Sequence, residues 1–67
     1  MRQNGTVKFF NASKGYGFIT PDDGGKDVFV HATGIWKRRS LEVGADVTFD
    51  VITTDKGPKA VDVSLRA

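Results

Sequence analysis

The stretch KGYGFITPDDGGKDVFVH, residues 14–31, contains two short runs with aromatic side chains at alternate positions, on either side of a turn rich in Gly and Asp. Side chains on a strand point to opposite faces in turn, so Tyr16 and Phe18 share one face. In the second run, Phe29 and His31 share a face opposite two valines. If the aliphatic residues face a core, the four rings lie side by side on the outside. Such a surface suits flat, negatively charged polymers.

Three other runs rich in β-branched and aromatic residues predict strands, and turn residues separate them. The expected strands are residues 6–10, 16–20, about 27–31, 46–53 and 59–65. Pro21 cannot donate to a strand ladder, so the second strand is expected to end before it. Residues 32–41 lack alternation, and we expect at most one helical turn there, with Ile35 pointing inward. Five short strands without helical periodicity predict an all-β fold, a small barrel in a single domain, residues 1–67.

The expected core consists of inward aliphatic side chains and one phenylalanine. Its members are Val7, Ile19, Val28, Val30, Ile35, Leu41, Val47, Phe49, Val51, Val61, Val63 and Leu65. This set takes up most of the large aliphatic residues without the rings at 16, 18 and 29, which argues against the alternative that those rings are core. A one-residue shift in register would exchange the two faces. Phe9 and Phe10 cannot share a face of a regular strand, so which of them points outward stays open unless a bulge intervenes.

Composition narrows the class of protein. Sixty-seven residues hold one small domain and leave little room for a large active-site cavity. The chain has no cysteine, which excludes disulfides and thiolate metal sites. No apolar run is long enough to span a membrane, and the first residues do not resemble an export signal. We therefore expect an unexported, cytoplasmic protein.

Nucleic-acid binding fits the exposed rings. Each base that stacks on an aromatic ring gains about 1–3 kcal/mol, and single strands present their base faces whereas duplexes do not. The formal charge is only +2, so binding must depend on stacking and local cations rather than on long-range attraction.

Two polar residues beside the rings have more than one interpretation. Asp27 could accept a hydrogen bond from a base edge, but a solvated carboxylate at a hairpin end explains it equally well. His31, the only histidine, is better explained by stacking than by metal binding or catalysis, because neither a ligand set nor a nucleophile and base accompanies it. We expect no enzyme activity, metal or cofactor.

Four segments resemble the bacterial cold-shock proteins, whose cold-shock domain is a version of the OB-fold. They are GTVKFFN (5–11), KGYGFI (14–19), VFVH (28–31) and KGPKA (56–60). The resemblance implies a five-stranded antiparallel OB-fold barrel that binds single-stranded RNA and DNA, with a preference for pyrimidine-rich stretches. It also implies an RNA chaperone of the stress response that melts weak secondary structure and influences transcription or translation.

The alternation, the nearby cations and the resemblance together predict a set of nucleic-acid-binding residues. They are Lys8, Phe9, Phe10, Lys14, Tyr16, Phe18, Asp27, Phe29, His31, Trp36, Lys37, Arg38, Arg39 and Lys56. We expect a monomer; a dimer formed by exchange of strands is an alternative that the short central loop allows.

The chain departs from the family pattern in the residues that would stack. Position 9 is Phe where the family usually has Trp, and Ala32 stands where another Phe is common. The following loop is short and reads Trp-Lys-Arg-Arg at 36–39. We predict that Trp36 and these three cations extend the aromatic surface. The alternative is that Trp36 plugs the end of the barrel.

Three other classes of protein can be weighed against this interpretation. An RNA recognition motif shares the string KGYGF but needs two helices and the reverse order of its motifs. An oligosaccharide- or peptide-binding barrel also uses rows of aromatic rings, but its binding would not weaken steeply with salt. A nuclease needs an acid, a base and a metal site, which this sequence does not assemble.

Overall fold

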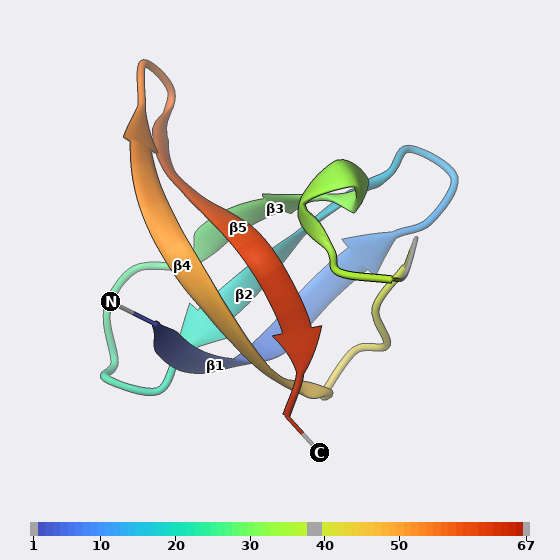
Figure 1. Cartoon of the computed structure of the whole chain (residues 1–67), viewed down its shortest axis with the longest axis horizontal. Helices are drawn as coiled ribbons and strands as arrows, with labels where there is room; N and C mark the ends of the chain where they lie inside the picture. The colour runs from blue at the N-terminus through green and yellow to red at the C-terminus, as the bar shows by residue number, and fades with distance from the viewer. Residues whose placement is uncertain (1, 38–39, 67) are drawn as a thin grey trace.

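The computed structural model describes residues 2–37 and 40–66, and within them five strands close into a barrel (Figure 1). The strands are β1 (Gln3–Asn11), β2 (Tyr16–Pro21), β3 (Val28–His31), β4 (Asp46–Thr54) and β5 (Gly57–Leu65), and a 3-10 turn, η1 (Ala32–Gly34), follows β3. Around the barrel the order is β1-β2-β3-β5-β4, and β4 pairs back with β1. The predicted all-β barrel is confirmed. No helix that could span a membrane occurs in the described part of the chain.

The pairing between β3 and β5 departs from the expected antiparallel arrangement. Phe29 lies beside Lys59 and Val30 beside Ala60 in a parallel register, whereas the other neighbouring strands are antiparallel. The cause is topological, because a closed ring with an odd number of strands cannot alternate in direction throughout. The barrel therefore needs at least one parallel seam, and it lies here.

The strand centres agree with the sequence prediction, and the ends differ where pairing is long-range. β1 begins at Gln3 rather than at Thr6, because residues 3–6 pair with β4. β5 begins at Gly57, which pairs with Thr54 across a tight hairpin. Pro21 is the last residue of β2 instead of the first residue after it. Such partners cannot be read from a local pattern of residue types.

The core contains nine of the twelve predicted residues. Its members are Val7, Ile19, Val28, Val30, Ile35, Leu41, Val47, Phe49, Ala60 and Val63. Val51 is half-buried and packs against this core. The prediction was wrong for Val61, which is half-buried, and for Leu65, which is 39% exposed. Ala60, which the prediction missed, is fully buried.

A bulge in β5 accounts for much of this difference. Thr48 pairs with Ser64 but Asp50 pairs with Val61, so two residues of β5, Asp62 and Val63, stand opposite one residue of β4. Asp62 has φ of 52°, a left-handed conformation that aspartate tolerates better than most residues. The extra residue shifts the alternation, so that residues 60 and 63 both point into the core.

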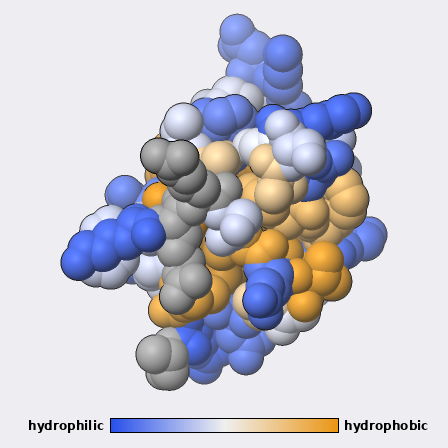
Figure 2. All heavy atoms as spheres, turned by 90° about the vertical axis from the view of Figure 1, so that its right-hand side faces the viewer, coloured by the Kyte–Doolittle hydropathy of each residue, from blue (hydrophilic) through white to orange (hydrophobic). Residues whose placement is uncertain are grey.

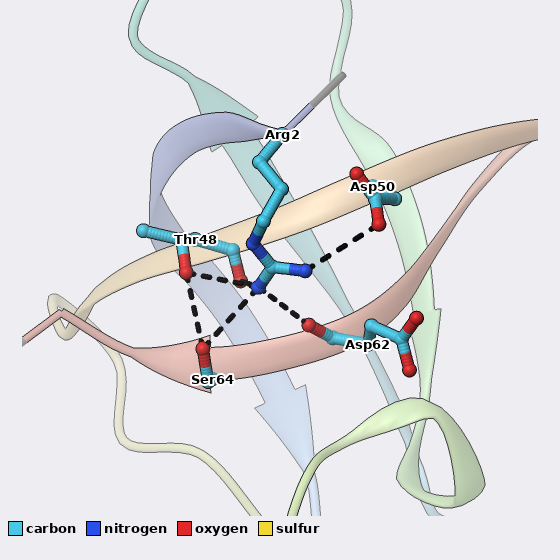
Figure 3. Close-up of polar contacts among 5 residues, drawn as sticks. All are labelled: Arg2, Thr48, Asp50, Asp62 and Ser64. Atoms are coloured by element: carbon cyan, nitrogen blue, oxygen red, sulfur yellow. Dashed lines mark hydrogen bonds and ion pairs between the residues drawn. The ribbon is translucent and has the colours of Figure 1, made fainter.

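Arg2 holds this bulge from outside the barrel (Figure 3). Its Nη2 donates to the backbone oxygen of Asp62 at 2.7 Å and to that of Thr48 at 3.1 Å, and it also reaches the hydroxyls of Thr48 and Ser64. Its Nη1 lies 3.4 Å from Oδ2 of Asp50. One guanidinium therefore ties the start of the chain to both strands of the β4–β5 wall.

Candidate nucleic-acid interface

A bulge in β1 decides which of the two consecutive phenylalanines points outward. Val7 pairs with Ile19 and Phe9 with Phe18, and the register shifts between them. The extra residue is Lys8, so Lys8 and Phe9 are both exposed. Phe9 is 42% exposed, whereas Phe10 packs against the core. Phe10, which the sequence placed in the binding set, is therefore not on the outer surface with the other rings.

Four rings meet on the outer face of β1, β2 and β3, and we call Phe9, Tyr16, Phe18 and Phe29 the aromatic row. Tyr16 contacts the other three, with ring centroids 6.0 Å from Phe9, 6.3 Å from Phe18 and 6.1 Å from Phe29. Phe18 and Phe29 are 6.0 Å apart. These are normal separations for interacting aromatic rings. The row is one continuous patch rather than four isolated side chains.

The opposite faces of β2 and β3 are fully apolar and closed to solvent. Ile19 and Val30 are 0% exposed, and Val28 is 4% exposed, while Phe18 in the same sheet is 36% exposed. The alternative that the rings form the core is therefore wrong. On β2 and β3, the large aromatic side chains therefore point outward, and smaller aliphatic side chains face the interior.

Gly17 brings the strands that carry the row close together. A Cβ atom at this position would lie 2.3 Å from the backbone oxygen of Phe9 and 2.8 Å from the Cα of Phe10, so a side chain would push β1 away from β2. The glycine between Tyr16 and Phe18 thus permits the contact between rings of neighbouring strands.

A fixed ion pair lies at one edge of the row. Lys8 Nζ donates to Oδ2 of Asp27 at 2.9 Å, and Thr20 Oγ1 donates to Oδ1 at 2.9 Å. The hydrogen bond from Lys8, followed by that from Thr20, lowers the pKa of Asp27 below its ordinary value. Asp27 is consequently an oriented, ionised acceptor rather than a free carboxylate in solvent, and each of its oxygens keeps a further lone pair for a ligand.

His31 lies beside Tyr16 in the β2–β3 register. Its Nδ1 accepts a hydrogen bond from the backbone N–H of Thr33 at 3.2 Å and lies 2.9 Å from Thr33 Oγ1. In the neutral ring this contact leaves the hydrogen on Nε2, which is available as a donor. Within residues 2–37 and 40–66, no three His, Cys, Asp or Glu residues are placed to hold a metal ion.

The β4–β5 hairpin forms a wall beside the row. A groove of about 520 Å³ lies between Phe18 and Phe29 on one side and residues 54–59 on the other. Lys56, a predicted site residue, lines it together with Lys59, which the sequence analysis did not select. Lys59 reaches this place because it lies next to Phe29 across the parallel seam. No local pattern signals that contact.

Further side chains complete the surroundings. Lys14 is exposed in the turn before β2, where its backbone N–H is held by Asn11 Oδ1 at 3.1 Å. The side of the barrel seen in Figure 2 shows hydrophobic surface that reaches solvent between hydrophilic side chains. Hydrophobic and hydrophilic surface are therefore interleaved on this side of the molecule.

Trp36 does not plug the barrel, because its side chain is 61% exposed. Its backbone N–H donates to Val63 O at 2.7 Å, and Lys37 Nζ lies 4.5 Å from the centroid of its ring. The grooves that it borders are shared with residues of β5 and not with the rings of the aromatic row. Arg38 and Arg39, the rest of the predicted basic run, lie outside the described residues.

A family model and similar curated proteins agree on one family. The family model described as 'Cold-shock' DNA-binding domain matches residues 3–66. The chain is 50% identical over 66 residues to Cold shock protein CspA of Rhizobium meliloti, which covers 96% of each chain. It is 56% identical over 63 residues to Cold shock protein 1 of Lactiplantibacillus plantarum, covering 91% of this chain and 94% of the relative.

A solved structure supports the fold. The structure titled drosophila Unr CSD456 superposes with a TM-score of 0.83 over 100% of this chain and 27% of the other, at 22% identity. At that level of identity the likeness concerns the fold alone. The family model and the sequence relatives show the family, and the solved structure agrees with the barrel fold.

Proposed function

This chain belongs to the cold-shock domain family, and on that basis we propose that it binds single-stranded RNA and DNA by stacking bases on the aromatic row. The observation that carries the proposal is the contact between four solvent-facing rings, with centroids 6.0–6.3 Å apart, over a core that does not include them. Every base has a face that can stack on such rings, at about 1–3 kcal/mol per base. A duplex hides those faces, so single strands are preferred.

Polar groups around the row supply the remaining contacts in this proposal. Lys14 and Lys56 pair with phosphates, and Lys59 adds a third cation on the hairpin side. The pair of Lys8 and Asp27 presents a donor and an acceptor next to each other, 2.9 Å apart. The Watson–Crick edge of each base carries a donor beside an acceptor, so this pair can bind a base edge without selecting one base. The preference for pyrimidine-rich strands is proposed from family membership alone.

Salt dependence tests whether nucleic acid is the ligand. If about three to five phosphates are neutralised, the logarithm of the affinity for oligothymidine should fall with the logarithm of salt concentration with a slope of about −2 to −3.5. The slope can be measured by fluorescence anisotropy of a labelled oligonucleotide between low and moderate salt. A flat slope would contradict nucleic-acid binding and favour a neutral ligand such as a sugar.

We further propose that the protein acts as a monomeric, cytoplasmic RNA chaperone that influences transcription or translation without a catalytic step. Stacking captures only bases that have already opened, so it stabilises the open state and needs no ATP. Family membership and the exposed row support this role.

A hairpin of marginal stability should lose its structure in proportion to added protein, and a long stable duplex should not. Circular dichroism or a quenched fluorophore pair on the stem measures both. Equal affinity for the duplex and the single strand would contradict the proposed chaperone role.

A further inference from the structure

Trp36 is the most exposed aromatic ring in the described part of the chain, at 61%. Tryptophan is highly buried on average, and its large apolar ring with a polar N–H makes it frequent at binding interfaces. The backbone around it is ordered by the bond from its N–H to Val63 O and by the bridge between Ile35 and Val63. A fixed backbone thus holds the indole outside the barrel.

Three adjoining grooves meet at this ring. One of about 440 Å³ runs between Trp36 and Lys59. Two others, of about 510 and 330 Å³, extend towards Leu65 at the end of β5. The indole is therefore the common wall of a hollow that follows the outer side of β5.

This hollow and the groove beside the aromatic row share one lining residue. Lys59 lines the groove under Phe18 and Phe29 and also the groove beside Trp36. It lies next to Phe29 on the neighbouring strand. A polymer that leaves the row at Phe29 meets Lys59 next and Trp36 after it.

The charges along this path fit a phosphate backbone on one side. Lys37 Nζ is 4.5 Å from the centroid of the indole, and Lys59 stands between the ring and the row. Asp62 also lines the groove, and its carboxylate repels phosphates towards the two lysines. When a strand binds, a base can take the place of the Lys37 ammonium on the indole ring, and the ammonium can move to a phosphate. The ring and the ammonium then each keep a favourable contact.

We propose that Trp36 is a second base-stacking site, separate from the aromatic row and reached only by strands long enough to pass Lys59. The proposal rests on the proposed function, because it concerns the continuation of the same strand. It predicts that affinity rises with oligonucleotide length beyond what the row can hold, and that this gain depends on Trp36.

The test compares labelled oligothymidines of about four and eight nucleotides, since OB-fold sites span roughly 4–16 nucleotides. The chain has one tryptophan, so indole fluorescence reports on this site alone, and anisotropy reports total binding. We expect the longer strand to quench the indole and the shorter one to bind without quenching. Trp36→Ala should weaken the longer strand by a factor of about 5 to 150 and leave the shorter strand unchanged.

Val43→Ala is the matched control, because Val43 is 67% exposed, lies later in the same connection between β3 and β4, and borders none of these grooves. Trp36→Phe should retain most of the gain because it keeps a ring. Unchanged affinity of Trp36→Ala for the longer strand would overturn the second site and leave the proposed function intact. Equal weakening of both lengths would also overturn it, since Trp36 would then belong to the row. If the unmodified protein bound neither strand, the proposed function itself would fail.

Discussion

Replacing Phe18 or Phe29 by alanine is expected to weaken oligothymidine binding by about 1–3 kcal/mol in each case, a factor of roughly 5 to 150. Each ring is in contact with two others of the row, at centroid distances of 6.0 to 6.3 Å. Phe18 is 36% exposed and Phe29 is half-buried, so each offers surface to a base that alanine cannot replace. Both substitutions are therefore expected to lower the affinity for the strand.

The free energy of unfolding should fall by less in these two variants than the roughly 3–5 kcal/mol expected when a fully buried phenylalanine is removed. What is lost in the free protein is contact with two other rings, each worth about 0.5–1.5 kcal/mol beyond the area buried. Urea denaturation measures this term, and anisotropy measures the affinity of the same samples. Large destabilisation with unchanged affinity would mean that the rings support the fold and do not contact the ligand.

Phe49→Ala is expected to have the opposite effect, with a loss of about 3–5 kcal/mol in the free energy of unfolding. Phe49 is fully buried at the centre of β4, and its removal leaves a cavity that the closed barrel cannot fill by collapse. Since small domains have stabilities of about 5–15 kcal/mol, this variant is near the limit of folding.

Thermal and urea unfolding of Phe49→Ala measure that loss. Where the variant is still folded, its affinity for oligothymidine should stay close to that of the unmodified chain. A loss of less than about 1 kcal/mol would be inconsistent with a tightly packed interior. Removing the buried phenylalanine should therefore mainly lower the free energy of unfolding, whereas removing an outward phenylalanine should lower the affinity for the strand.

The outward row could be predicted from the sequence because period-two alternation is a local property. Tyr16, Phe18 and Phe29 each stand opposite aliphatic residues, and the structure buries those aliphatic residues. The bulges could not be predicted in the same way. The extra residue in β1, Lys8, and that in β5, near Asp62, depend on how a partner strand is aligned, and no residue type in either strand marks the shift.

Long-range partners account for the rest of what the sequence missed. Lys59 becomes part of the candidate site only because β5 lies beside β3. Arg2, before the first strand, reaches the backbone oxygen of Asp62, 60 positions along the chain. Trp36 was recognised as unusual from its neighbours in sequence, yet its position over β5 depends on the hydrogen bond to Val63. These contacts arise from barrel closure and not from local propensity.

The NMR spectrum of the aromatic ring protons during titration with oligothymidine tests the central claim most directly. Stacked bases shift the resonances of the rings that they cover. We predict large shifts for Phe9, Tyr16, Phe18 and Phe29, and little change for the buried ring of Phe49. Saturable binding that leaves these four rings unshifted would contradict the account, because the strand would then lie on another face of the barrel.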